Sequence, residues 1–385
     1  MEPQHLAIVG GGIGGLTAAL SLQKAGMRVS VFERAPELRE VGAGLVVTGS
    51  SMLGLDFLGV GPALRATAGE LPIGGSHVHT MRHYRTAETF PGADANSGQP
   101  GSIAAHRADL HGVLLAAVTA NDPTCIHLDH EFDRLVESVD GVTVTFTNGR
   151  SYTVDGVIGA DGTSSAVRPF LFGPEPVAYT GKVSFRGLIP RSAITPEIAA
   201  ESCNFYVGPD RMFLCYFLRG RDLFNVVAHA RQPGWEEEGW AIRAEIDDLL
   251  GLYHDFHERV KNVIRAIPPE NLFKWALRDR PPCAQWTKGR VTLLGDAAHP
   301  MLPFLGQGGN MAIEDGVVVG RAFAAASSLD EAFARYEAAR KERGTATQLM
   351  SRSRAEELMA FESDEAMETG RRGVARLYDP STIEV

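Results

Sequence analysis

The hydrophobic pattern at the start of the chain predicts a strand, a glycine turn, a helix and a second strand. His5 to Val9 is a short apolar run, and Arg28 to Phe32 is another. Between them we expect a helix over Leu16 to Lys24. Glu33 follows the second run directly. The pattern is that of a βαβ unit, in which two parallel strands flank a crossover helix.

Similar apolar runs return later in the chain. A β-branched run, Val291 to Leu294, predicts a strand that leads into Gly295-Asp296, a proline-rich turn and a helix near Asn310. A helix is expected from about Arg107 to Thr119. Residues 142–147 and 151–158 predict a hairpin, because Asn148-Gly149 between them is typical of a type I′ turn.

Residues 204–230 differ from the rest, because three alternating strands with short turns follow one another there, and helices are expected at about 240–266. We therefore expect a discontinuous nucleotide-binding domain interrupted by a β-sheet domain. The segments are 1–71, 100–175 and 286–369 for the first domain, 72–99 and 176–285 for the second, and 370–385 for a C-terminal tail.

The N-terminal glycines carry the first chemical signal. Gly10, Gly12 and Gly15 form G-x-G-x-x-G between the predicted strand and helix. These glycines permit a tight turn and a close approach to a pyrophosphate, whose charge the helix dipole favours. Glu33, 23 residues after Gly10, is placed to accept hydrogen bonds from a ribose diol. The motif predicts dinucleotide binding by Gly12, Ile13, Gly14, Glu33 and Arg34.

A second glycine cluster, Gly306, Gly308 and Gly309, precedes the helix near Asn310. Its backbone N–H groups and the positive helix N-terminus suit a flat ligand that becomes negative when it works, and a reduced flavin is such a ligand. Between the two clusters, Asp161-Gly162 ends another predicted strand, and Thr163 or Ser164 is placed to cap a helix.

The composition narrows the function classes. The formal net charge of −10 argues against nucleic acid and anionic membrane as partners. No apolar run reaches the ~18–20 residues that span a bilayer, and the start of the chain lacks the basic region of a signal peptide, so a cytoplasmic protein is expected. The 4 cysteines are far apart without a C-x-x-C pair, which excludes a thiol-redox flavoprotein and a cysteine-based metal site.

The three motifs in this order resemble the FAD-dependent aromatic hydroxylases, the group A flavoprotein monooxygenases. The segments GGGIGG, GADG and GDAAHPMLPFLGQGGN match the signatures of that family. Within it, the chain is similar to the salicylate hydroxylase, 3-hydroxybenzoate 6-hydroxylase and 6-hydroxynicotinate 3-monooxygenase group. The implied fold class is α/β: a Rossmann-like FAD-binding domain of the p-hydroxybenzoate hydroxylase type, with an inserted β-sheet substrate domain and C-terminal helices.

The resemblance also implies the reaction. NADH or NADPH reduces FAD, dioxygen forms a flavin C4a-hydroperoxide, and an electron-rich ring attacks its distal oxygen. The expected substrate is a small aromatic or heteroaromatic acid or phenol. A monomer and a homodimer are both compatible with the sequence.

The resemblance assigns further residues to FAD: Gly44, Arg107, Asp161, Asp296, Gly306, Gly308, Gly309 and Asn310. Asp296 is expected at the ribityl chain or pyrophosphate, and the glycine cluster at the pyrimidine edge of the flavin. Pro303 is expected to shape the floor beneath the reacting carbon. His299 lies in the cofactor motif, so we expect it to be structural.

The substrate residues are expected on the inserted sheet. Tyr216 matches a tyrosine that faces the substrate in relatives, and Arg211 resembles in position an arginine of flavin-dependent urate hydroxylases, although a surface turn also explains it. Relatives carry a histidine at the position of Met212, which cannot accept a proton. Either the substrate is already electron-rich or another base serves. For His229 we expect a structural role on its strand.

Three alternatives remain open: a hydroxylase of urate or another heterocycle, a flavin halogenase or reductase on the same scaffold, and a flavoprotein without catalysis. The halogenase signature W-x-W-x-I-P is absent, since no two of the 4 tryptophans are two residues apart. The intact glycine cluster argues against the non-catalytic alternative.

Overall fold

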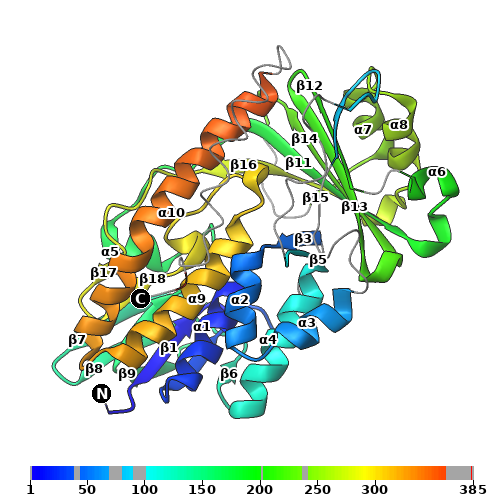
Figure 1. Cartoon of the computed structure of the whole chain (residues 1–385). Helices are drawn as coiled ribbons and strands as arrows, with labels where there is room; N and C mark the ends of the chain where they lie inside the picture. Colours follow the sequence, from blue (N-terminus) through cyan, green and yellow to red (C-terminus); the bar gives the residue numbers. More distant parts are fainter. Residues whose placement is uncertain are drawn as a thin grey trace.

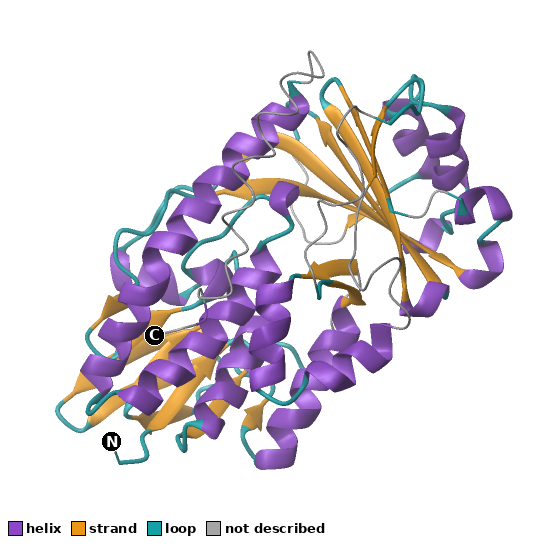
Figure 2. Cartoon of the chain, in the orientation of Figure 1, coloured by secondary structure: helices purple, strands orange, loops and turns teal. Residues whose placement is uncertain are grey.

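The computed structural model describes residues 2–38, 44–68, 80–89, 101–200, 203–235, 242–360 and Ile383. In space, two large β-sheets lie at opposite ends of the described structure, and helices pack against both of them (Figure 2). The predicted α/β fold class is confirmed.

The first sheet has six strands among the described residues, in the order β17-β18-β10-β1-β2-β6. All neighbours are parallel except β17 and β18. The bounds are β1 His5–Val9, β2 Arg28–Phe32, β6 Ile126–His127, β10 Gly156–Gly159, β17 Thr287–Lys288 and β18 Val291–Leu293. The predicted βαβ unit is confirmed, with helix α1 over Ile13–Lys24.

Two glycines make the turn before α1 as tight as the motif predicts. Gly10 has φ +111°, and a Cβ there would lie 2.3 Å from the carbonyl oxygen of Ala160. A Cβ on Gly15 would lie 2.0 Å from the carbonyl oxygen of Gly10. Both positions therefore require glycine, because a side chain would meet backbone.

Helix α9 (Gly308–Ala325) packs closely on α1. A Cβ on Gly316 would lie 2.7 Å from Cβ of Thr17, and one on Gly320 would lie 2.1 Å from Oγ of Ser21. Small residues thus let the two helix backbones approach each other. The other helices of this region are α2 (Gly49–Phe57), α3 (Gly61–Ala68), α4 (Arg107–Asn121) and α5 (Val167–Phe172).

The second sheet has seven strands within the described ranges, in the order β15-β16-β11-β14-β13-β12-β4, and only the β12–β4 pair is parallel. The bounds are β4 Thr80–His83, β11 Ala178–Pro190, β12 Asn204–Gly208, β13 Arg211–Leu218, β14 Leu223–Arg231, β15 Ile242–Arg243 and β16 Leu272–Asp279. The three strands predicted over 204–230 are confirmed. Helices α6 (Pro196–Ala199), α7 (Ile246–Leu252) and α8 (Glu258–Arg265) lie against its outer face (Figure 1).

Two smaller sheets complete the fold, and one of them differs in part from the predicted hairpin. β3 (Gly44–Val47) pairs with β5 (Ile103–His106), and β8 (Gly141–Phe146) lies between β7 (Phe132–Ser138) and β9 (Ser151–Val154). The run predicted over 151–158 divides at Asp155, because β10 leaves the hairpin for the parallel sheet. The type I′ turn was wrong: Gly149 has φ +80°, but Asn148 does not adopt the positive φ that this turn requires at both positions.

Every strand of the seven-stranded sheet lies in the segments 72–99 and 176–285, and every strand of the parallel sheet lies in 1–71, 100–175 or 286–369. The boundaries themselves stay a prediction. The predicted tail 370–385 lies outside the described residues except for Ile383, whose carbonyl accepts a hydrogen bond from Nη1 of Arg321 at 2.7 Å. Among the helices of the described ranges, none is long and apolar enough to span a membrane.

Helix α10 (Leu329–Met359) runs beside both sheets (Figure 1). Near its start, Tyr336 donates a hydrogen bond to the carbonyl of Leu293 at 3.1 Å in the parallel sheet. At its end, the carbonyl of Met359 accepts one from the N–H of Asp210 at 2.9 Å in the second sheet. The helix therefore fixes the second sheet relative to the first.

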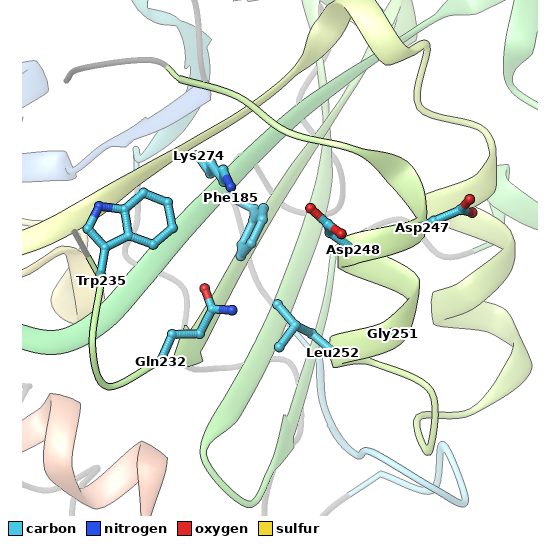
Figure 3. A pocket seen from close by; sticks show the side chains of 8 residues that line it. All are labelled: Phe185, Gln232, Trp235, Asp247, Asp248, Gly251, Leu252 and Lys274. Carbon is cyan, nitrogen blue, oxygen red and sulfur yellow. The ribbon is translucent and has the colours of Figure 1, made fainter. Parts of the chain in front are cut away.

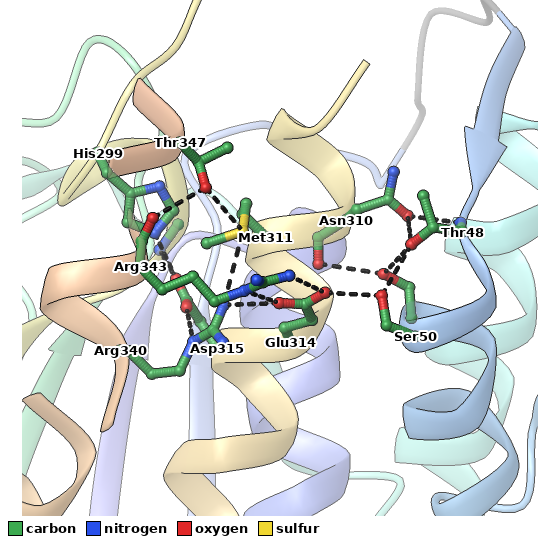
Figure 4. Close-up of polar contacts among 12 residues, drawn as sticks. Thr48, Ser50, His299, Asn310, Met311, Glu314, Asp315, Arg340, Arg343 and Thr347 are labelled. Atoms are coloured by element: carbon green, nitrogen blue, oxygen red, sulfur yellow. Dashed lines mark hydrogen bonds and ion pairs between the residues drawn. The ribbon is translucent and has the colours of Figure 1, made fainter. Parts of the chain in front are cut away.

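A buried polar network joins α10 to the middle of α9 (Figure 4). Arg340 donates from Nε to Asp315 at 2.7 Å and from Nη2 to Glu314 at 3.0 Å, and all three side chains are 0% exposed. His299 lies 2.6 Å from Asp315, and Ser50 donates to Glu314 at 3.0 Å. His299 is therefore structural, as expected.

The charges of this network outweigh the effect of burial. Burial alone would raise the pKa of Asp315, but His299 and Arg340 lower that pKa to about 2. Asp315 is thus held ionised inside the protein, and its buried charge depends on Arg340 for compensation.

We expect Arg340→Met to lower the free energy of unfolding by about 3–5 kcal/mol, because it leaves the buried carboxylate of Asp315 without its arginine, whereas Glu314 keeps its pair with Arg343. Chemical denaturation of the purified variant measures this change. The matched control is Arg335→Met on the same helix, whose exposed pair with Glu331 is expected to contribute less than about 1 kcal/mol. Equal losses in the two variants would contradict a central role for Arg340.

Candidate active site

The glycine loop before α1 is held by Glu33. The carboxylate of Glu33 accepts the N–H of Gly11 at 2.8 Å and that of Ala35 at 3.0 Å, and His111 bonds the carbonyl of Gly11 at 2.8 Å. Arg34 is exposed beside this turn. Neither Glu33's contact with the loop nor the part played by His111 was expected from the sequence, since both depend on how β2 and α4 meet the loop.

The N-terminus of α1 is open. Gly12 is its N-cap without a side-chain cap, the first turn holds no acidic residue, and a Cβ on Gly12 would meet nothing within 4 Å. By contrast, Ile13 is buried, and a Cβ on Gly14 would lie 2.9 Å from Leu294. The backbone N–H groups at this end are therefore available to an anion such as a pyrophosphate.

The N-terminus of α9 has the same character. Its cap residue, Gln307, makes no side-chain cap, and Gly306 before it is left-handed with φ +64°. A Cβ on Gly308 would lie 3.7 Å from Oδ1 of Asp296. Burial raises the pKa of Asp296, and the charges of His299 and Arg107 oppose the rise. Arg107, at the start of α4, thus acts on the carboxylate that faces the glycine cluster.

The segment that contains Asp161 is hydrogen-bonded to the turn around Asp296. Oδ2 of Asp161 accepts the N–H groups of Ala166 and Val167 at 2.7 and 3.1 Å, while its Oδ1 is buried without a hydrogen-bond partner. The predicted cap by Thr163 or Ser164 was wrong: the N-cap of α5 is Ala166, and Asp161 and Ser165 accept the N–H groups at the start of the helix. Arg168 donates to the carbonyls of Ala297 and Ala298 and so ties the motif to the Asp296 turn.

Strand β3 connects the α9 terminus to the second sheet. At one end, a Cβ on Gly44 would lie 2.9 Å from Oη of Tyr216, and the Gly44 N–H donates to Asn225 at 2.9 Å. Farther along β3, Leu45 lies 3.3 Å from where a Cβ of Gly309 would be. Residues predicted from three separate motifs therefore meet here: Gly44, Tyr216, and the adjacent Gly309 and Asn310.

The side chain of Asn310 is fully used by the protein. It donates to the carbonyls of Val46 and Gly306 at 2.9 and 3.0 Å and accepts the N–H of Thr48 at 2.9 Å. This side chain positions the glycine turn, which leaves the backbone of the cluster to face a cofactor.

The face of the second sheet that contains Tyr216 carries a row of polar side chains. Sequence reasoning did not select Ser184, Arg186 or Asn225, and it expected only a structural role for His229. Ser184 of β11 pairs with His229 of β14, Arg186 pairs with Val227, and Asn225 lies one pair farther along, so all four polar side chains share one face. Ser184 Oγ, Arg186 Nε, Asn225 Nδ2 and His229 Nδ1 are all buried without a hydrogen-bond partner in the described structure. The missed signal was their period of two within otherwise apolar strands.

Met212 and His229 are register partners on this face. Met212 is 4% exposed and packs with Leu302 and Phe304, the segment that includes Pro303. His229 stacks near Phe304, with ring centres 4.8 Å apart. Burial, reinforced by Arg186, lowers the pKa of His229 well below its ordinary value. His229 is therefore neutral near pH 7, and Met212 beside it makes an apolar contact.

The structure does not bring Arg211 together with Tyr216. Five positions apart on β13, the two side chains point to opposite faces. Arg211 donates to Asp255 at 2.7 Å and 3.2 Å and lies over the ring of Phe256 on the outer, helix-covered face. The hypothesis that Arg211 contacts substrate beside Tyr216 is thus replaced by a structural ion pair.

A surface pocket of about 450 Å³ also lies on that outer face, between the sheet and α7 (Figure 3). It is lined by Phe185, Gln232, Trp235, Asp247, Asp248, Gly251, Leu252 and Lys274. Phe185 alternates with Arg186, so the sheet separates this pocket from the polar row. The pocket is not the candidate active site.

Comparison with known proteins agrees with this geometry. A family model described as an FAD binding domain matches residues 4–352. The chain is 32% identical over 345 residues to 3-hydroxybenzoate 6-hydroxylase of Klebsiella oxytoca, covering 86% of this chain and 83% of that relative. The chain belongs to the family of FAD-dependent aromatic hydroxylases. It is also 33% identical over 366 residues to 6-hydroxynicotinate 3-monooxygenase of Pseudomonas fluorescens, with 91% of each protein covered.

Solved structures confirm the predicted fold. HpxO of Klebsiella pneumoniae, complexed with FAD and uric acid, matches with a TM-score of 0.82 at 26% identity, covering 99% of this chain and 96% of that one. A salicylate hydroxylase substrate complex matches with a TM-score of 0.82 at 25% identity, covering 99% and 97%. The protein is therefore an FAD-dependent aromatic monooxygenase, as predicted.

The residues present fit FAD. Two uncapped helix N-termini, the open side of Gly12 and the partnerless Oδ1 of Asp161 are polar features that the described protein atoms leave unused. The α1 end would hold the pyrophosphate, and the α9 end would hold the flavin edge that becomes negative on reduction.

We expect Gly12→Ala to fold normally yet bind FAD about tenfold more weakly or worse, since its methyl group enters only the space that a pyrophosphate needs. Titration of the apoprotein with FAD, followed by flavin fluorescence, measures the affinity. Gly15→Ala is the contrasting variant, because its methyl group would meet backbone and should lower the stability of the apoprotein by about 1–3 kcal/mol. Unchanged FAD affinity in Gly12→Ala would contradict this placement of the pyrophosphate.

Proposed function

We propose that the protein hydroxylates a small aromatic or heteroaromatic acid or phenol, with NADH or NADPH as reductant and dioxygen as oxidant. One observation carries the proposal: β3 joins the open α9 terminus to the polar row around Tyr216. A ring bound against that row would lie beside the flavin edge. Bound FAD supplies the activation of dioxygen.

The relatives support a substrate of this size and kind. Their names specify 3-hydroxybenzoate, 6-hydroxynicotinate and salicylate, and HpxO was solved with uric acid. All four are small, flat rings, and the first three are hydroxylated acids. Urate or another heterocycle remains the second candidate, because the likeness to the HpxO complex spans almost the whole chain.

The protein's own contribution would be to place the ring and to exclude water. Leu214 and Val227 flank the polar row on the same face and supply apolar contact to a ring. Tyr216 supplies a hydrogen bond to a ring substituent: burial raises the pKa of Tyr216 to about 12, with Arg186 opposing, so its phenol keeps its proton.

The proposed function is tested by anaerobic reduction of the FAD-loaded protein by NADH and by NADPH. We expect one member of a panel of hydroxybenzoates, aminophenols, hydroxypyridines and urate to raise the reduction rate. Aerobic turnover should then give hydroxylated product in proportion to the NAD(P)H consumed. Reductant consumption without product from any of these compounds would argue against a hydroxylase of this class.

For Tyr216→Phe we expect kcat/KM to fall about 3- to 10-fold, the loss of one hydrogen bond, with the shape of the pH–rate profile unchanged between pH 6 and pH 10. With a pKa of about 12, only about one Tyr216 in ten thousand is ionised at pH 8, so it cannot act as the base. Tyr206→Phe, on the helix-covered face, is the control. Loss of a limb of the profile in Tyr216→Phe alone would show that Tyr216 titrates in catalysis.

A further inference from the structure

Arg186 is a cation without a counterion. It is half-buried on β11, and no described residue forms a hydrogen bond or an ion pair with its guanidinium. Its contact is with Trp275, whose ring centre lies 5.8 Å from the guanidinium carbon. By contrast, the fully buried arginines Arg168 and Arg340 are each paired with a carboxylate. An unpaired charge of this kind is costly, so its retention calls for a partner outside the chain.

The surroundings of Arg186 are positive or neutral. Burial lowers the pKa of Arg186; Tyr216 opposes that shift, and Arg107 adds to it. No carboxylate is among the groups that act on this charge. His229 on the neighbouring strand is neutral for the reason given above. This side of the sheet therefore attracts an anion.

Hydrogen-bond donors surround the cation. Asn225 uses its oxygen to accept the N–H of Gly44 at 2.9 Å, which leaves its Nδ2, a pure donor, buried and without a partner. Ser184 Oγ, two residues before Arg186, is also without a partner. Guanidinium, amide and hydroxyl groups together can donate several hydrogen bonds to an oxyanion, whereas the apolar edge of a substrate ring would leave these donors without an acceptor.

We infer that Arg186 binds an oxyanion carried by the substrate ring, either a carboxylate or a phenolate, and that this contact restricts the enzyme to anionic substrates. The inference rests on the proposed function and adds the charge of the substrate to it.

The same contact accounts for Met212. A phenol that reaches the site as its phenolate has already released its proton to solvent, so it needs no base on β13. A neighbouring guanidinium favours the ionised form of a bound phenol by charge attraction. A fixed cation thus favours ionisation of the phenol by charge attraction, without proton transfer to a base at position 212.

Equilibrium binding to the FAD-loaded protein tests the inference without turnover. Two matched pairs of probes distinguish the oxyanions: 3-hydroxybenzoate against 3-hydroxybenzamide for a carboxylate, and 4-cyanophenol against 4-methoxybenzonitrile for a phenolate. The change in flavin absorbance gives each dissociation constant. In the unaltered protein, the acidic member of at least one pair should bind about 10- to 100-fold more tightly than its neutral partner.

Arg186→Gln should abolish this preference while the neutral probes keep their affinity, and Arg186→Lys should retain part of it. The control is Arg278→Gln, which removes an exposed arginine from the neighbouring strand β16 and should change neither affinity. FAD content and melting temperature verify that each variant folds. Because Arg186 has no internal counterion, we expect its removal to leave the melting temperature unchanged or to raise it.

Four outcomes would overturn the inference: equal affinity for both members of each pair, no saturable binding of either anion, equal loss for both members in Arg186→Gln, or a lowered melting temperature as the main effect. Equal loss would indicate that Arg186 acts on the flavin instead. These results are independent of hydroxylation, since no reductant is present. Product formed without any preference for anions would leave the proposed function intact and contradict the role of Arg186 alone.

Discussion

The site depends on how firmly the middle of α9 is anchored. Glu314 and Asp315 are fully buried about two helical turns inside the N-terminus that faces the flavin position, and Arg340 of α10 binds both of them. Asp315 also accepts the N–H of Gly295, at 3.1 Å, and contacts His299. A single buried ionic cluster therefore sets α9, α10 and the turn around Asp296 relative to one another. Breaking one partner of such a cluster is costly, which makes the arrangement rigid.

The second sheet uses its two faces for opposite purposes. On the outer face, the charge of Arg211 is satisfied within the protein by Asp255. On the inner face, a row of buried polar atoms has no partner among the described residues. Unsatisfied groups of this kind reduce stability, and proteins concentrate them where a ligand completes them. The contrast between Arg211 and Arg186 thus locates the substrate side of the sheet more clearly than the residue types do.

Strand β3 is where cofactor and substrate regions become one site. Its backbone reaches Tyr216 and Asn225 only because Gly44 has no side chain. A few residues later it is bound by Asn310, whose amide also holds the turn at Gly306. The distance between the flavin edge and the polar row is consequently set by backbone and amide contacts, which shift less than long side chains do. This suits a reaction whose rate depends on where the ring is held.

The sequence by itself determined the βαβ unit, the three cofactor motifs and the family, because each of these depends on the local spacing of residues. The signals were glycines at positions of close backbone approach, an acidic residue directly after a strand, and apolar runs of fixed period. It also predicted Tyr216, Asp296 and the glycine cluster as separate candidates, without showing that they meet. It could not reveal that Arg211 is paired with Asp255, that Asp161 caps α5, or that Arg186 lacks a counterion. Those facts depend on which side chains from distant segments lie within hydrogen-bonding distance. Pairing and burial of charge are properties of the packed chain, so only the tertiary structure decided them.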